Sequence, residues 1–235
     1  MREESYQPHY GHRPWLTVCD SPQTGLFFKA GAADFELARG ESLDFGRGHF
    51  VFWIERGLIA TFPFETMSEP VVMGLFGPCT VLGSVMVLSR RENRMAIAAR
   101  ALADTSGWKL PASVFRDWAL ADPQRAQDFF CNCVGKTECQ LEGSGANDLL
   151  TVPGRLALLF QTLLEGAGLD WRKAESYPLE LPWPLTVTDL ACIVHAERSR
   201  VSAAVSRFTR AGILSREGRR LLFLSPPRDP SPKGS

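Results

Sequence analysis

The 235-residue sequence lacks the features that define several large classes of protein. It has no run of about 18 uncharged apolar residues, which a membrane-spanning helix would need. Its first residues, MREESYQPHYGHRP, are polar and lack the apolar segment of a secretion signal. The Gly-rich phosphate loop, the HExxH motif and the GxSxG motif are also missing. We therefore predict a cytoplasmic protein that has no membrane partner and is not an enzyme, with its six cysteines as free thiols.

The sequence has no net charge, because 26 Lys and Arg residues balance 26 Asp and Glu residues. This balance excludes a uniformly basic surface of the kind that coats nucleic acids. The charges are nevertheless unevenly distributed. Residues 1–150 contain 14 basic and 18 acidic residues, whereas residues 182–235 contain nine basic and four acidic ones. Such an asymmetry suggests that the C-terminal part binds something anionic.

Residues 25–120 are predicted to form a β-roll, preceded by an extension at residues 1–24. Between residues 25 and 110, short apolar runs alternate with Gly or Pro, as in a β-barrel or sandwich. No helix of ten or more residues is expected there. The aromatic side chains of this part could line a pocket for a hydrophobic ligand or simply form the core. They are Phe27, Phe28, Phe45, Phe50, Phe52, Trp53, Phe62 and Phe64.

A long helix is predicted at residues 121–146, beginning with the helix-start pair Asp122-Pro123. Its apolar residues form a narrow stripe, which is typical of a helix that pairs with a second copy of itself. The stripe consists of Phe130, Val134, Leu141 and Thr137. Packing against its own β-roll is the alternative. The segment GSGAND at residues 143–148 is expected to break the helix and to mark a domain boundary.

Residues 147–225 are predicted to form a winged helix-turn-helix domain. Thr186 or Thr188 would cap a first short helix, and residues 195–197 would form the turn. A second helix would run from Arg198 to about Ala211, with its apolar stripe buried. The buried residues would be Leu190, Ile193 and Val194 in the first helix and Val201, Val205 and Phe208 in the second. The Pro-rich residues 226–235 are expected to be a disordered tail.

The exposed face of the second helix would be small and polar, so that its backbone could approach DNA bases closely. Arginines flank this face, and a following hairpin carries three more arginines that suit a phosphate backbone. The residues predicted to contact DNA are Arg198, Ser199, Arg200, Ser202, Ala203, Ser206, Arg207, Arg216 and Arg219. The alternative is a ligand-sensing or protein-interaction module without DNA binding.

Three segments resemble the CRP/FNR superfamily of bacterial transcription regulators. They are TVPGRLALLFQTLL, LTVTDLACIVHAERSRVSAAVSRFTRAGIL and HFVFWIERGLIATF. The resemblance implies an α+β chain with an N-terminal cyclic-nucleotide-binding-like β jelly roll, a long dimerisation helix and a C-terminal winged helix-turn-helix. It also implies a homodimer that binds an inverted repeat in double-stranded promoter DNA, with RNA polymerase as a further partner.

The family positions that read bases are Arg198, Ser199, Ser202 and Ala203. Arg198 could bind a guanine edge with two hydrogen bonds. The cyclic-AMP-responsive and oxygen-responsive members have a glutamate at the position of Ser199, so their half-site is not expected for this chain.

The resemblance places an effector pocket at Gly83, Ser84, Arg94 and Met95. In nucleotide-binding members a glutamate stands at the position of Ser84, and a hydroxyl residue stands at the position of Met95. Because both contacts are missing, cyclic AMP is not expected, and the effector remains unknown.

Neither an iron–sulfur cluster nor haem is supported by the sequence. Cys131, Cys133 and Cys139 do not converge on one helix face, and an N-terminal cysteine cluster is absent. These cysteines could be ordinary helix residues, a redox-sensitive thiol or a site shared across a dimer. The histidines are His9, His12, His49 and His195, of which His49 is the best single candidate for haem.

Overall fold

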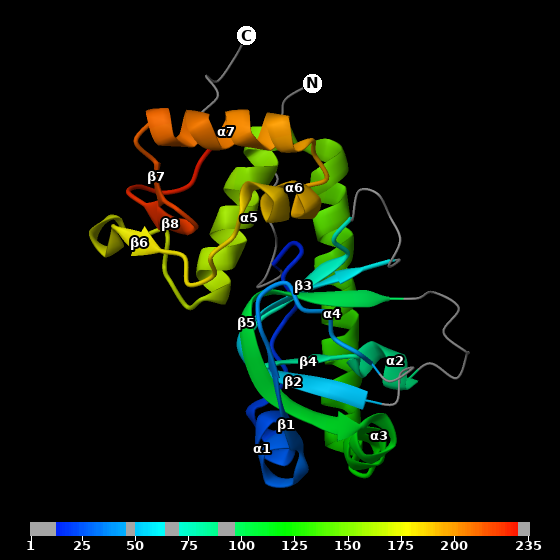
Figure 1. The fold of residues 1–235 in the computed structure, drawn as a ribbon. Helices are drawn as coiled ribbons and strands as arrows, with labels where there is room; N and C mark the ends of the chain where they lie inside the picture. The colour runs from blue at the N-terminus through cyan, green and yellow to red at the C-terminus, as the bar shows by residue number, and fades with distance from the viewer. Residues whose placement is uncertain (1–12, 46–49, 64–70, 89–96, 230–235) are drawn as a thin grey trace.

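The computed structural model describes residues 13–45, 50–63, 71–88 and 97–229 of the chain. They form a five-stranded antiparallel sheet, a long helix beside it, and a C-terminal helical unit with a three-stranded sheet (Figure 1). Among these residues, no helix is both long and apolar enough to cross a membrane.

The five-stranded sheet is built around two long strands that pair with each other along most of their length. Its strand order is β1-β5-β2-β3, and β4 also pairs with β2. At Gly57, which has a φ of +102°, the register between β2 and β5 shifts, and a Cβ there would collide with Thr105. The strands are β1 (Ala33–Leu37), β2 (Phe50–Phe62), β3 (Gly74–Phe76), β4 (Thr80–Leu82) and β5 (Ala98–Pro111).

No helix of ten or more residues lies wholly within the described part of residues 25–110, but a ten-residue helix extends into that range from its N-terminal side. Helix α1 spans Pro22–Gly31, and a short helix α2 spans Ser84–Leu88. The first helix begins because the Ser21 side chain accepts a hydrogen bond from the Thr24 backbone N–H. It is then held by Phe28, which is fully buried against Trp53.

Helix α3 (Ala112–Leu120) leads into the long helix α4 (Pro123–Leu149). The Asp122 side chain accepts a hydrogen bond from the Arg125 N–H and caps α4 as predicted. The predicted break at residues 143–148 is wrong, because α4 continues through them. Gly143 instead allows a close approach, since a Cβ there would lie 2.5 Å from Cδ1 of Trp15.

The C-terminal unit contains the two helices and the hairpin that the sequence predicts. The inward residues predicted for both short helices are buried. The three-stranded sheet has the order β6-β8-β7. The elements are α5 (Val152–Gly166), the 3₁₀ turn η1 (Ala174–Ser176), β6 (Leu179–Glu180), α6 (Val187–Ile193), α7 (Arg198–Arg210), β7 (Leu214–Glu217) and β8 (Arg220–Phe223).

The first residues of the predicted disordered tail are ordered against α5. Pro227 is buried, and its carbonyl accepts a 2.7 Å hydrogen bond from Nε2 of Gln161. This corrects the expectation for residues 226–229, because these contacts fix a Pro-rich segment that could not fold alone. Residues 230–235 lie outside the described part of the chain.

One continuous apolar core joins the β-roll to the C-terminal unit. Leu58 and Leu75 from the roll belong to the same buried cluster as Leu159 of α5 and Trp183. Polar contacts reinforce this junction. Arg39 donates to Oδ2 of Asp189 at 2.5 Å, across the boundary between the two parts.

Candidate nucleic-acid interface

The first helix of the helix-turn-helix unit is fixed by a capping box at Thr186. The Thr186 hydroxyl accepts a 3.1 Å hydrogen bond from the Asp189 N–H, and Oδ2 of Asp189 accepts a 2.7 Å hydrogen bond from the Thr186 N–H. Of the two caps that the sequence left open, the structure therefore selects Thr186. The helix ends at Ile193, and His195 forms the turn with a φ of +45°.

Helix α7 buries one face and exposes the other, and it lies at the end of the molecule opposite α1 and α3 (Figure 1). Val201 and Phe208 are fully buried, and Phe208 packs edge-on against Phe160 of α5 with ring centroids 5.7 Å apart. All residues of α7 that were predicted to contact DNA are exposed. They are Arg198, Ser199, Arg200, Ser202, Ala203, Ser206 and Arg207.

The arginines on this exposed face are available for an external anion. Within the described part of the chain, Arg198, Arg200 and Arg207 form no ion pair. The small side chains between them leave the helix backbone accessible, as reading of base edges requires.

The hairpin β7–β8 supplies a second basic surface. Its two-residue turn consists of Gly218, with a φ of +62°, and the exposed Arg219. Nε of Arg216 donates to the Gly218 carbonyl at 2.9 Å, which holds that side chain near the tip. Arg220 differs from the other two, because it forms two hydrogen bonds of 2.6 and 2.5 Å with Glu180 of β6. Two of the three hairpin arginines are thus free of acidic partners among the described residues.

Arg155 of α5 positions this interface, and the sequence assigned it no role. Its Nη1 donates to the carbonyls of Val194 at 2.9 Å and His195 at 3.2 Å, and its Nε donates to the Leu150 carbonyl at 2.8 Å. Burial and the positive charge of Arg200 lower the pKa of Arg155. The only signal in the sequence was the Gly-Arg pair of TVPGRL.

His195 faces the β-roll. Its Nε2 lies 3.3 Å from the Val72 carbonyl, and burial lowers the pKa of the imidazole. The Val72 N–H in turn donates to the Cys192 carbonyl at 3.2 Å. The turn of the helix-turn-helix is therefore in direct contact with the N-terminal β-roll, at the segment that precedes β3.

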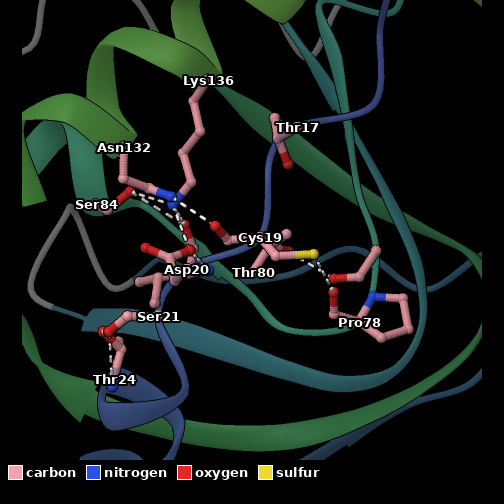
Figure 2. Close-up of polar contacts among 12 residues, drawn as sticks. Thr17, Cys19, Asp20, Ser21, Thr24, Pro78, Thr80, Ser84, Asn132 and Lys136 are labelled. Atoms are coloured by element: carbon pink, nitrogen blue, oxygen red, sulfur yellow. Dashed lines mark hydrogen bonds and ion pairs between the residues drawn. The ribbon is translucent and has the colours of Figure 1, made fainter. Parts of the chain in front are cut away.

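The predicted effector residues Gly83 and Ser84 line a cavity of about 370 Å³ between the β-roll and α4. Its walls also contain Phe76, Met73 and, from α4, Thr137. The Ser84 hydroxyl donates to the Val81 carbonyl at 3.1 Å and accepts a 3.0 Å hydrogen bond from Nζ of Lys136 (Figure 2). Arg94 and Met95 lie outside the described residues.

The Lys136 ammonium lies in a buried polar cluster that sequence reasoning missed. Lys136 is only 1% exposed, and its Nζ lies 2.6 Å from Oδ2 of Asp20 and 3.0 Å from the Val81 carbonyl. Figure 2 shows the lysine reaching from α4 between the N-terminal segment and Ser84. Burial raises the pKa of Asp20, and the adjacent ammonium opposes this rise. The cluster ties three distant segments together.

The cysteines are all free thiols. On α4, Cys131 is exposed, whereas Cys133 and Cys139 are buried, and burial raises the pKa of Cys133 to about 11. In the described ranges no group of three or more His, Cys, Asp and Glu residues could hold a metal ion. His9, His12, His49 and Phe64 lie outside the described residues.

This combination of a β-roll, a long helix and a winged helix-turn-helix defines the fold class of the CRP/FNR transcription regulators. No family model matches the sequence, and no curated protein matches it either.

Solved structures of this family have the same fold. FixK2 from Bradyrhizobium japonicum is 18% identical with a TM-score of 0.68, over 82% of this chain and 92% of FixK2. The c-di-GMP-responsive global regulator CLP from Xanthomonas campestris is 14% identical with a TM-score of 0.65, over 87% of this chain and 100% of CLP. A CRP/FNR-family regulator from Thermus thermophilus is 15% identical with a TM-score of 0.62, over 82% of this chain and 94% of its own.

Proposed function

We propose that this protein is a transcription regulator of the CRP/FNR type that binds double-stranded DNA as a homodimer. The observation that carries the proposal is the exposed face of α7, where small residues alternate with arginines that have no ion-pair partner among the described residues. The arginines of the β7–β8 hairpin extend this surface and suit the phosphate backbone.

The exposed stripe of α4 supports dimerisation. The exposed fractions of Phe130, Val134 and Leu141 are 48%, 57% and 67%. A row of exposed large apolar side chains is typical of a surface that another protein chain covers. Their spacing matches a helix that pairs with a second copy of itself. A symmetric dimer of this kind would present two copies of α7 to two half-sites of an inverted repeat.

The proposal includes RNA polymerase as a partner at the promoter and leaves room for an effector in the cavity beside Ser84. Such an effector would shift the dimer between arrangements of its DNA-binding units. Cyclic AMP is not proposed, because the Ser84 hydroxyl is already bonded to Lys136 and cannot replace a ribose-binding carboxylate. A protein-interaction module without DNA binding is less well supported, since no acidic side chain lies on the exposed face of α7.

The proposal is tested by selecting bound duplexes from a random pool with the purified protein and no added ligand. Enrichment of an inverted repeat is expected, with half-sites about one helical turn apart. A pool that stays unenriched, both alone and after addition of cell extract, would refute DNA reading by this protein. Enrichment only with extract would instead indicate a required effector.

Two arginine variants should separate base reading from backbone binding. Arg198→Ala is expected to relax selection at one base pair of each half-site, because a bidentate contact to guanine contributes about 1–3 kcal/mol of discrimination. Arg219→Ala should weaken binding to all duplexes alike. It should also reduce the slope of log K against log salt concentration by about one unit per hairpin. Fluorescence anisotropy titrations with the selected and a scrambled duplex measure both effects. An equal loss on both duplexes for Arg198→Ala would contradict its base-reading role.

A further inference from the structure

Two exposed cysteines from distant parts of the chain, Cys19 and Cys79, lie next to each other on the β-roll. The Cys19 thiol donates to the Pro78 carbonyl, with Sγ 3.8 Å from the oxygen (Figure 2). One residue further along both segments, the Asp20 N–H donates to the Cys79 carbonyl at 2.8 Å. These two hydrogen bonds place the Cys19 sulfur beside the backbone of Cys79.

The turn that carries Cys79 holds it in a conformation that cysteine rarely adopts. Pro78 and Cys79 form the turn that leads into β4, and Cys79 has a φ of +63°. Proline is common at the first central position of such a turn, whereas a positive φ at the second favours glycine or asparagine. The Cys79 N–H donates to the Ile54 carbonyl at 2.8 Å, which fixes the turn on β2. A thiol at a position that would suit glycine better points to a role for the sulfur.

The segment that carries Cys19 is fixed to helix α4 on its other side. Nδ2 of Asn132 donates to the Cys19 carbonyl at 2.9 Å, and Nζ of Lys136 lies 2.6 Å from Oδ2 of Asp20. The same oxygen of Asp20 accepts a 2.6 Å hydrogen bond from the Val81 N–H of β4. A covalent bond between the two cysteines would therefore act on a segment that contacts both α4 and β4.

We propose that Cys19 and Cys79 are a redox-sensitive pair, which peroxide converts to a reversible disulfide that ties the N-terminal segment to the β3–β4 turn. This pair acts independently of DNA binding. In a reducing environment both cysteines stay thiols, as they are in this structure. An exposed disulfide is accessible to a dithiol reductant, so the bond can be broken again by thiol–disulfide exchange.

The oxidation proceeds in two balanced steps. The Cys19 thiolate attacks one oxygen of hydrogen peroxide, the O–O bond breaks, and Cys19 becomes a sulfenic acid as the first water leaves. The Cys79 thiolate then attacks the Cys19 sulfur, the S–O bond breaks, and the hydroxide takes up the proton lost by Cys79 and leaves as the second water. Two thiols thereby give up two electrons in total, and one peroxide is reduced to two waters.

The surroundings of Cys79 assign it to the second step. Partial burial raises the pKa of Cys79, and the negative charges of Cys19, Glu55 and Asp20 add to this rise. Because only a thiolate attacks peroxide, a thiol with a raised pKa reacts slowly at neutral pH, which leaves the first step to Cys19. The sulfenic acid of Cys19 is neutral, so the contribution of the Cys19 charge is gone when Cys79 reacts.

The test treats the purified full-length protein, first reduced and then freed of reductant, with one equivalent of hydrogen peroxide. The remaining thiols are alkylated, and digestion with mass spectrometry identifies the linked peptides. A peptide pair that joins Cys19 to Cys79 is expected, and dithiothreitol should separate it. Cys131→Ser is the matched control, because it removes another exposed cysteine and should leave the bond unchanged. Absence of this link, or a preferred link of either cysteine to a different one, would overturn the inference.

Thermal unfolding measures the consequence of the bond. Peroxide should raise the melting temperature of wild type and of Cys131→Ser by about 5–10 °C, because the bond closes a long loop in the unfolded chain. Cys19→Ser and Cys79→Gly should show no such rise, and glycine suits the positive φ at residue 79 and so preserves the turn. A linked wild type without a rise in melting temperature would show a strained bond and would contradict a pair that the fold already brings together. An equal rise in Cys79→Gly would also refute the pair.

Discussion

Val134→Glu combined with Leu141→Glu is expected to convert the proposed dimer to a monomer and to lower affinity for the selected inverted repeat about 100-fold or more. Both side chains are more than half exposed on the same stripe of α4. In a symmetric dimer each new carboxylate would face its copy in an apolar seam, where burial of like charges is strongly unfavourable. A monomer would then lose the gain of binding two half-sites at once, which amounts to about 10²–10⁴ in affinity.

Sedimentation velocity and duplex titrations measure the two effects separately. Gln124→Glu is the control, because it adds a negative charge to an exposed position of α4 outside the stripe. Retention of the dimer by the double variant would place the interface elsewhere. A monomeric variant with unchanged affinity would show that dimerisation is not required for DNA binding.

Lys136→Met is expected to lower the free energy of unfolding by about 3–5 kcal/mol, the usual cost of removing one partner from a buried ion pair. The ammonium is bonded to Asp20, Ser84 and the Val81 carbonyl in a site that excludes water. Methionine fills a similar volume but leaves the Asp20 carboxylate buried without its counter-charge. Urea unfolding curves give the change from the shift in midpoint at constant slope.

The double variant Asp20→Asn with Lys136→Met should recover much of this loss, because it removes both charges. Lys173→Met, at a side chain that is 62% exposed, should change stability by less than about 0.5 kcal/mol. A cost below about 1 kcal/mol for Lys136→Met, or no recovery in the double variant, would contradict the buried pair.

The helix-turn-helix could be predicted in detail because its signals are local. The Thr186 cap and the spacing of Val201, Val205 and Phe208 depend on residues within one or two turns of helix. The same local reasoning correctly predicted which face of α7 is exposed.

Sequence reasoning failed where contacts between distant segments decide the structure. Gly143 reads as a helix breaker, but Trp15 packs against it and α4 continues. No local pattern marks Lys136 as buried, because its partner Asp20 lies 116 residues away. Arg155 could not be assigned a role because its acceptors are backbone carbonyls of the helix-turn-helix. Every residue has such a carbonyl, so no residue type in the sequence identifies the acceptor.

The junction between α4 and α5 has a mechanical consequence. Only Leu150 and Thr151 separate Leu149 from Val152, and both have extended backbone conformations. The connection between α4 and α5 therefore consists of only four backbone dihedral angles, and α7 lies on the α5 side of it. A change in these angles would rotate α5, and α7 with it, relative to the β-roll. Because one apolar core also joins the two parts, such a rotation would require the Arg39–Asp189 ion pair to separate and the shared core around Leu159 and Trp183 to repack.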